Sequence, residues 1–302
     1  MNIAIIGAGA LGSYFGVRWL RAGANVQFIV REKRAKQLHK HGLTLHSVKG
    51  DDQIQSPSAI IHAEEAVKPD VIVIAVKGYH LDAVLDTIKT LAGPDTFLLP
   101  ILNGVAHYQT LADHFGEEKI LGGLANIIAT LDESGHVEHT SEIHEIRFGA
   151  LHHGQEQICE QLEEISKKAN MQAAYSEKML TDIWYKYMFI TAFSGITTAS
   201  ELEIGPLLKH QATKDVLNML FQEMRQIAIA EKVDLTDRRI EKAWATIQQL
   251  PVKATSSMHQ DYRKGLPLEL EHLHGAAIAI AKKHQLDVPA LHTIYGIIKA
   301  KS

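Results

Sequence analysis

The sequence is short of cysteine, of excess positive charge and of long apolar runs, and each shortage excludes a class of protein. The single cysteine, Cys159, has no partner for a disulfide within the chain. The 31 lysines and arginines are outnumbered by 35 aspartates and glutamates, which argues against binding to nucleic acid or to an anionic membrane. Apolar runs such as GAAIAIA at residues 275–281 fall below the roughly 18 residues of a membrane helix. We therefore expect no membrane span.

Length and the first residues suggest what kind of protein this is. A chain of 302 residues is long for one hydrophobic core, so we expect two domains. The chain opens on NIAIIG, which reads as a strand and lacks the charged region and cleavage site of a secretory signal. We therefore expect a cytoplasmic protein.

The order of apolar segments predicts an α/β fold followed by helices. Apolar strands such as NIAIIG, NVQFIV, DVIVIAVK, TFLLPILNG and KILGGLANIIA alternate with helical stretches, which is typical of a doubly wound, Rossmann-type sheet with parallel strands. The period-two stretch EHTSEIHEIRFGAL predicts two antiparallel edge strands. We expect a Rossmann domain over 1–174 and an all-α domain over 175–302, with helices at 179–193, 212–232, 237–249, 267–284 and 290–300.

The motif GAGALG joins the first expected strand to the first expected helix. Its glycines permit a tight turn, close approach of backbone to a pyrophosphate and close packing of helix on strand, and the helix N-terminus adds positive potential. In this strand-turn-helix context the motif predicts a dinucleotide site, although a turn that only packs would also use glycines. The predicted contacts come from Gly7, Ala8, Gly9, Ala10, Leu11 and Gly12.

The second strand ends in VREKR, which bears on the choice between NAD and NADP. An acidic residue about twenty residues beyond the glycines would bind the ribose of NAD, whereas arginine would accommodate the 2′-phosphate of NADP. Arg31 directly follows the strand, so we favour NADP, with NADPH as the reductant. Glu32 keeps NAD open, because a shift of one residue would exchange the two side chains. The alternative to both cofactor interpretations is that VREKR is only a solvated loop.

Two polar residues follow apolar strands at the edge where doubly wound sheets bind ligands. Lys77 ends DVIVIAVK, and Asn103 ends TFLLPILN before Gly104. Each could contact a ligand or only terminate its strand.

Lys186 lies in WYKYMFITAFSG, a helix-like segment that is otherwise almost entirely apolar. An unpaired buried ammonium is costly, and desolvation lowers a lysine pKa toward the range of a general acid. The alternative is a lysine whose stem packs while its head reaches water. Glu223 falls on the apolar stripe of a later helix and could pair with a lysine or hold an interface.

The polar segment TSSMHQDYRKGLPLELEH precedes a helix whose inner face could carry Glu269 or Glu271, and Ser257 within it could be only a helix cap. No HExxH, Cys/His cluster or G-x-S-x-G occurs, so we predict neither a metal site nor serine-hydrolase chemistry.

Together these stretches resemble the ketopantoate reductase (2-dehydropantoate 2-reductase) family of the 6-phosphogluconate dehydrogenase-like superfamily, along essentially the whole chain. The resemblance is carried by GAGALG, by AVK ending at Lys77, by NGV at Asn103, by W-x-K ending at Lys186, and by SSMHQD with the downstream LELEHLHG.

The resemblance implies a role for each of these residues. Lys186 would protonate the carbonyl oxygen of a 2-oxo acid as NADPH delivers hydride to carbon 2, and Glu223 would support the lysine. Asn103 would contact cofactor and substrate, and Ser257 would bind the polar end of the substrate. Further cofactor contacts are implied for Arg31, Lys77, Ile128 and Glu269.

The sequence departs from the family pattern at positions expected to line the substrate-binding site. Four and eight residues after the lysine the family usually has asparagines, whereas this chain has Ile190 and Ser194, and a further amide is replaced near Ile204. We expect ketopantoate reduction in pantothenate synthesis first, and reduction of a more apolar 2-oxo acid second. A non-catalytic NADP(H) sensor and a hydroxyacyl dehydrogenase of the same superfamily stay open behind these two. The apolar helices could also supply a homodimer interface.

Overall fold

The computed structural model describes residues 1–302, which divide into two compact units. The N-terminal unit comprises Met1–Leu102 and His107–Met179, and the helical unit comprises Asn103–Ala106 and Leu180–Ser302. The sequence placed the boundary at 174/175, a few residues before the division at 179/180, and did not anticipate that the short segment after Leu102 belongs with the helices.

The first sheet of the N-terminal unit is parallel throughout, as the sequence predicts. Its order is β5-β2-β1-β6-β7. The strands are β1 (Asn2–Ile6), β2 (Asn25–Ile29), β5 (Ser58–Ile60), β6 (Val71–Ile74) and β7 (Phe97–Pro100). Ile3 and Ile5 of β1 pack with helices α1 (Ala10–Arg21) and α5 (Glu156–Ser166) on one face, whereas Ala4 and Ile6 pack with α3 (Leu85–Leu91) and α4 (Ala106–Phe115) on the other. Burial of both faces explains the continuous apolar runs.

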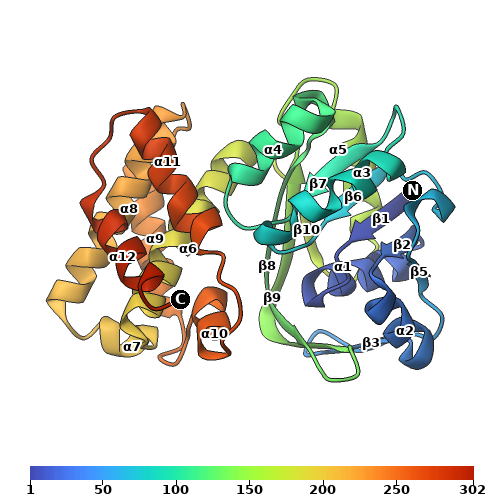
Figure 1. Cartoon of the computed structure of the whole chain (residues 1–302), viewed down its shortest axis with the longest axis horizontal. Coiled ribbons are helices and arrows are strands. Elements are labelled where there is room, and N and C mark those ends of the chain that lie inside the picture. Colours follow the sequence, from blue (N-terminus) through green and yellow to red (C-terminus); the bar gives the residue numbers. More distant parts are fainter. The chain divides into compact units, whose positions relative to one another are not determined.

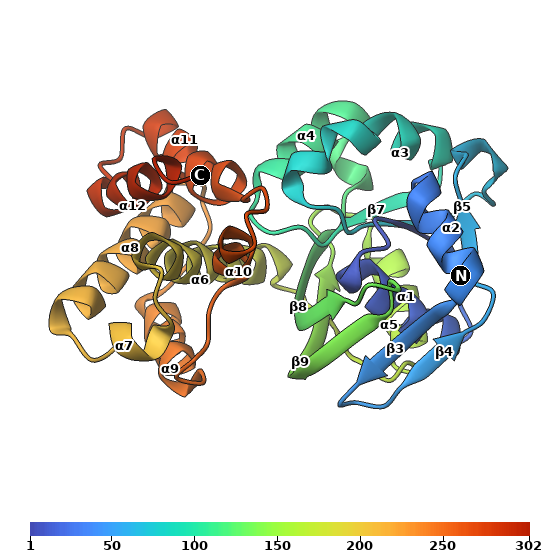
Figure 2. The same cartoon turned by 60° about the horizontal axis from the view of Figure 1, so that its bottom comes forward.

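A second sheet corrects two expectations from the sequence. EHTSEIHEIRFGAL does not form two edge strands, because residues 137–149 make one long strand, β9 (Val137–Gly149). KILGGLANIIA adds only one isolated parallel bridge to the first sheet, between Ile120 and Leu98 of β7. Its main part, β8 (Gly122–Leu131), instead pairs antiparallel with β9 (Figure 2). On its other side β9 pairs with β3 (Leu43–Ser47) and β10 (Gln172–Tyr175), and β3 pairs with β4 (Asp52–Ile54).

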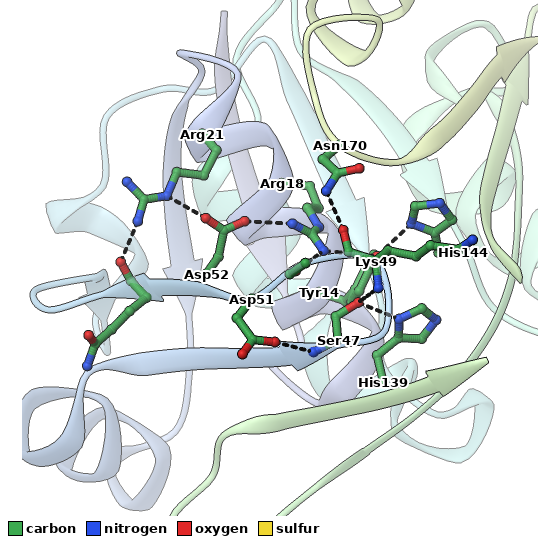
Figure 3. Close-up of polar contacts among 12 residues, drawn as sticks. Tyr14, Arg18, Arg21, Ser47, Lys49, Asp51, Asp52, His139, His144 and Asn170 are labelled. Atoms are coloured by element: carbon green, nitrogen blue, oxygen red, sulfur yellow. Dashed lines mark hydrogen bonds and ion pairs between the residues drawn. The ribbon is translucent and has the colours of Figure 1, made fainter. Parts of the chain in front are cut away.

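Helix α1 is attached to the second sheet by a buried polar network (Figure 3). The guanidinium of Arg18 is 1% exposed and donates to Asp52 over 2.7 Å, and the same carboxylate accepts from Arg21 over 2.9 Å. The Tyr14 hydroxyl lies 2.7 Å from Nδ1 of His144, whose ring stacks on that of His139. These bonds fix the direction of the helix that follows the glycine motif.

The helical unit contains the all-α half that the sequence predicts. Its helices are α6 (Met179–Ser200), α7 (Ile204–Leu207), α8 (Gln211–Ala230), α9 (Asp237–Gln249), α10 (Ser257–Arg263), α11 (Ala276–Lys283) and α12 (Pro289–Lys299), and a π-helical turn, η5 (Glu271–Gly275), leads into α11. Helices α11 and α12 pack on α8 (Figure 1) around one continuous apolar core. The short helices α7 and α10 were not predicted. None of the helices has the length and apolar character needed to cross a membrane.

Candidate functional site

The glycine motif forms the turn between β1 and α1. Gly7 has a φ of 99°, and a Cβ there would lie 2.8 Å from the carbonyl of Ala75, just beyond β6. A Cβ on Gly12 would lie 2.2 Å from the carbonyl oxygen of Gly7. Both positions therefore require glycine, one for its backbone conformation and both for close packing.

The turn fits the pyrophosphate of a dinucleotide. Gly9 is the N-cap of α1, and a Cβ on it would meet no atom within 4 Å, so the backbone there faces open space. No side chain caps α1 and its first turn carries no acid, which leaves amide donors and positive potential for an anion. The strand order reverses between β1 and β6, beside this turn, where doubly wound sheets bind ligands.

The four cations after β2 have different surroundings. Arg31 is exposed at the N-cap of α2 (Glu32–His41), and Lys33 beside it is also exposed. Lys36 pairs with Glu32 over 2.6 Å, whereas Arg34 is partly buried and donates to the carbonyl of Ala8 over 2.9 Å. Arg31 and Lys33 are thus the cations available to a 2′-phosphate. The sequence singled out Arg31, which directly follows the strand, and gave no sign of the contact of Arg34 with the glycine turn.

The other cofactor contacts implied for this unit lie on different elements. Lys77 comes two residues after Ala75, which packs on Gly7, so the main chain at Lys77 runs beside the glycine turn. Ile128 lies on β8 at an irregularity in its pairing with β9, and 67% of its surface is exposed. Its role in cofactor binding stays a prediction.

In the helical unit, Asn103 and Glu269 lie side by side. The Asn103 amide donates to Oε2 of Glu269 over 3.4 Å, although 166 residues separate them. Gly104 has a φ of 83°, and a Cβ there would lie 2.8 Å from the carbonyl oxygen of His272 in η5. The turn after β7 therefore packs on the π-helical segment, and the Glu269 side chain is 4% exposed. Two residues predicted for one site meet within one unit.

Lys186 is partly buried on α6, and two of the residues expected to line the substrate site lie on the same helix. Ile190 is partly buried, and Ser194 is only 3% exposed. Ile204 is 1% exposed within the apolar core, and its amide donates to the carbonyl of Ala254. The Ile204 side chain therefore serves packing in the apolar core, whereas Ile190 is only partly buried and Ser194 is a buried polar residue.

Glu223 caps a neighbouring helix of the helical unit. Its Oε1 accepts from the Ala290 amide over 2.9 Å and its Oε2 from the Leu291 amide over 2.8 Å. These amides belong to the first turn of α12, where a carboxylate satisfies unpaired donors and complements the helix dipole. These two hydrogen bonds of Glu223 cap α12, and the implied support of Lys186 stays a prediction.

The two serines at the start of α10 occupy different helix positions. Ser256 is the N-cap, since its Oγ accepts from the His259 amide over 3.1 Å and lies 3.1 Å from the Thr197 hydroxyl. Ser257 is the first helical residue and is exposed. Its alternative role as a cap is therefore excluded, and substrate binding by Ser257 stays a prediction.

The buried histidine of η5 was among the polar side chains that the sequence analysis missed. His274 is fully buried in η5, and a Cβ on Gly195 of α6 would lie 2.5 Å from its Nε2. Burial lowers the pKa of His274 to about 4, so the ring is neutral at physiological pH. Its spacing from the buried Leu270 and Ala277 placed it on the inner face, which is a signal the sequence carried. No group of three His, Cys, Asp or Glu side chains in the chain could hold a metal ion.

Comparisons with known proteins agree with this architecture. The family model described as "Ketopantoate reductase PanE/ApbA" matches residues 3–153, and the one described as "Ketopantoate reductase PanE/ApbA C terminal" matches residues 178–302. An uncharacterised oxidoreductase, YkpB, of Bacillus subtilis is 36% identical over 98% of this chain and 97% of its own. A 2-dehydropantoate 2-reductase of Pyrococcus abyssi is 25% identical over 100% of this chain and 98% of its own.

Solved structures share the fold over the whole length. The 2-dehydropantoate 2-reductase of Methylococcus capsulatus is 25% identical, with a TM-score of 0.90 over 99% of this chain and 96% of its own. A D-mandelate dehydrogenase with NADH and anilino(oxo)acetate is 24% identical, with a TM-score of 0.90 over 100% and 98%. Since the two family models cover both units, the chain belongs to the ketopantoate reductase family and is an oxidoreductase of that type.

Proposed function

We propose that this protein reduces a 2-oxo acid to a 2-hydroxy acid with NADPH, and that ketopantoate is its first candidate substrate. The observation that carries the proposal is the Asn103–Glu269 contact, because it brings two residues implied for one site together within the helical unit that also carries Lys186. The family's 2-dehydropantoate 2-reductases, such as that of Pyrococcus abyssi, support the substrate class.

Each polar residue has a distinct task in this proposal. The nicotinamide cofactor supplies the hydride. Lys186 donates a proton to the substrate oxygen, which gains negative charge as the carbonyl is reduced. Asn103 and Glu269 orient the reacting groups, and Ser257 binds the polar end of the substrate. The exposed guanidinium of Arg31 binds the 2′-phosphate and so favours NADPH.

A more apolar 2-oxo acid is the second candidate, and the composition of α6 favours it. Ile190 places a branched aliphatic side chain, and Ser194 a short one, where the family usually has amides. Each amide hydrogen bond contributes roughly 0.5 to 1.5 kcal/mol, so ketopantoate would bind more weakly unless other donors replace them. The likeness to a D-mandelate dehydrogenase, which was solved with anilino(oxo)acetate, supports an aromatic substrate.

Initial-rate measurements test the proposal directly. NADPH oxidation is followed with ketopantoate and with a panel of branched and aromatic 2-oxo acids, and each reaction is repeated with NADH. Lys186→Ala should lower kcat by about a hundredfold or more, as expected for loss of a general acid. The matched control is Lys178→Ala, which removes an exposed lysine just before α6 and should leave kcat unchanged.

The outcomes separate the candidates. A preference for ketopantoate supports the first substrate, whereas a preference for phenyl- or branched-chain 2-oxo acids supports the second. NADPH binding without turnover of any 2-oxo acid contradicts catalysis and supports a sensor instead.

A homodimer is also part of the proposal. Apolar side chains remain exposed on two long helices, namely Met219 and Ile229 on α8 and Ile297 on α12. Such exposed apolar side chains are of the kind that an association surface would cover. Sedimentation velocity at micromolar concentration should show a dimer, and a monomer would contradict this part.

A further inference from the structure

Arg34 holds the carbonyl group at the centre of the glycine turn. Its Nε donates to the carbonyl oxygen of Ala8 over 2.9 Å, and its Nη2 lies 3.2 Å from Oγ of Ser13. The hydroxyl of Ser13 donates to the same carbonyl over 3.2 Å. Ser13 lies fully buried in α1, and Arg34 lies in α2. The Ala8 carbonyl is therefore held by two donors from two different helices.

This carbonyl belongs to the same peptide group as the Gly9 amide. A trans peptide is planar, so its C=O and N–H point in opposite directions. Fixing the Ala8 carbonyl on the side of Arg34 therefore points the Gly9 N–H away from Arg34. Gly9 is exposed at the N-cap of α1 and a Cβ on it would face open space. It is at this glycine that backbone approaches the pyrophosphate in dinucleotide-binding turns.

The β8–β9 hairpin sets the orientation of the guanidinium. Nη1 of Arg34 donates to the carbonyl of Gly135 over 2.8 Å and to Oε1 of Gln37 over 2.9 Å. Gln37 in turn donates to the carbonyl of Glu133 in the same hairpin over 3.1 Å. The side chain of Arg34 thus spans the distance between the hairpin and the glycine turn.

The charge of Arg34 also acts on this turn. None of its four acceptors is ionised, so no contacting carboxylate neutralises the guanidinium. Burial lowers the pKa of Arg34 and the more distant Asp132 opposes that effect, but a guanidinium still stays protonated at neutral pH. A cation behind the turn adds to the positive potential at the N-terminus of α1.

We propose that Arg34 is a positioning residue that aims the Gly9 amide at the cofactor pyrophosphate, whereas Arg31 acts on the choice between NADPH and NADH. The proposal rests on the proposed use of a nicotinamide dinucleotide. It assigns different work to two arginines that stand three residues apart. The pyrophosphate is common to both cofactors, so loss of Arg34 should weaken both by the same factor. The 2′-phosphate occurs only in NADPH, so loss of Arg31 should weaken that cofactor alone.

Cofactor titrations of the full-length protein test this division. Dissociation constants for NADPH and NADH are measured by fluorescence for wild type, Arg34→Met and Arg31→Met. Arg34→Met should raise both constants by about tenfold and leave their ratio unchanged. Arg31→Met should raise the NADPH constant by about tenfold and leave the NADH constant unchanged. In steady state, Arg34→Met should change the KM for cofactor much more than kcat.

Two further variants separate positioning from folding. Arg34→Lys keeps the charge and should restore part of the affinity for both cofactors. Gly135→Ala acts from the hairpin, because a Cβ there would lie 2.0 Å from Nη1 of Arg34, and it should also weaken both cofactors. Lys40→Met, an exposed position on α2, is the matched control and should change neither constant. Circular dichroism confirms that each variant is folded.

Two results would overturn the proposal. If Arg34→Met weakens NADPH alone, Arg34 is a second ligand of the 2′-phosphate. If it lowers the Tm but changes neither constant, Arg34 only fastens the hairpin. The proposed NADPH preference fails on a separate result, namely equal binding of NADPH and NADH by the wild type, and the common factor expected for Arg34→Met would still hold.

Discussion

The side-chain amide of Asn103 donates a hydrogen bond to the carboxylate of Glu269 over 3.4 Å, in surroundings where Glu269 is 4% exposed. Asn103 stands three residues beyond β7 of the first sheet, yet it belongs to the helical unit. This contact therefore attaches the turn after β7 to the residues that lead into η5.

Replacing the amide by a carboxylate should destabilise the protein in a pH-dependent way. Asn103→Asp places two carboxylates about one hydrogen bond apart, and such a pair cannot keep both charges at low cost. We expect the Tm difference from wild type to be larger at pH 8 than at pH 5, where the pair can share a proton. Asn103→Ala is the control, and its Tm difference should be equal at both pH values. Equal differences for Asn103→Asp as well would show that the two side chains do not interact.

Restoring amides on α6 should improve binding of ketopantoate. Ile190→Asn and Ser194→Asn should each lower the KM for ketopantoate by about two- to tenfold, since an added hydrogen bond contributes roughly 0.5 to 1.5 kcal/mol. Ile204→Asn is the matched control, because that side chain is 1% exposed in the core. It should lower the free energy of unfolding by about 3 kcal/mol without improving the KM. A higher KM in both α6 variants would indicate that the apolar wall suits another substrate.

Removing the Glu223 carboxylate should destabilise α12. Glu223→Ala leaves two buried amides of the first turn without acceptors, so the free energy of unfolding in urea should fall by about 2 to 4 kcal/mol. Glu223→Gln keeps one acceptor and should cost about half as much. The kcat of the folded variants should change little. A hundredfold loss of kcat with unchanged stability would instead favour the role of supporting Lys186.

The histidine pair in Figure 3 should make the protein less stable in acid. Burial, followed by the positive charges of Arg18 and Lys49, lowers the pKa of both His139 and His144, and the two rings also repel each other when protonated. The Ile143 carbonyl and Glu142 oppose this for His139, and Tyr14 and Asp52 complete the surroundings. Because the unfolded state takes up these protons more readily, stability is present above about pH 6.5 and falls as the pH drops toward the lowered values.

Urea unfolding between pH 5 and 7.5 measures this loss. The slope of unfolding free energy against pH should be shallower in His144→Gln than in wild type. His153→Gln, a fully exposed histidine, should keep the wild-type slope. Equal slopes in all three proteins would show that the buried rings do not titrate with folding.

Local signals in the sequence were sufficient for part of this structure. Gly7 and Gly12 are dictated by the turn they form, and the β1 strand is apolar because both of its faces are covered, so each could be predicted from neighbouring residues. The sequence could not show that β9 is a single strand, because its partners change from β3 to β10 along its length and its pairing with β8 is irregular near Ile127. Those partners are distant in sequence and leave no local mark.

The roles of the functional residues also depend on partners that are distant in the sequence. Glu223 shows a carboxylate on a buried stripe, but the amides that donate to it lie 67 and 68 residues further on, so the sequence could not choose between its roles. The two serines before α10 also looked alike, and Ser257 even stands three residues before Gln260, as in a capping box. Only the bond from the His259 amide identifies Ser256 as the cap.

The segment Asn103–Ala106 lies in the N-terminal half of the sequence but belongs to the helical unit. Any chimera that joins residues 1–179 of this chain to the helical half of a relative takes Asn103 from one parent and Glu269 from the other. Recombination at the apparent boundary therefore succeeds only between parents whose residues at these two positions are compatible. A cut at residue 179 looks simplest along the chain, but it is the cut that separates Asn103 from Glu269.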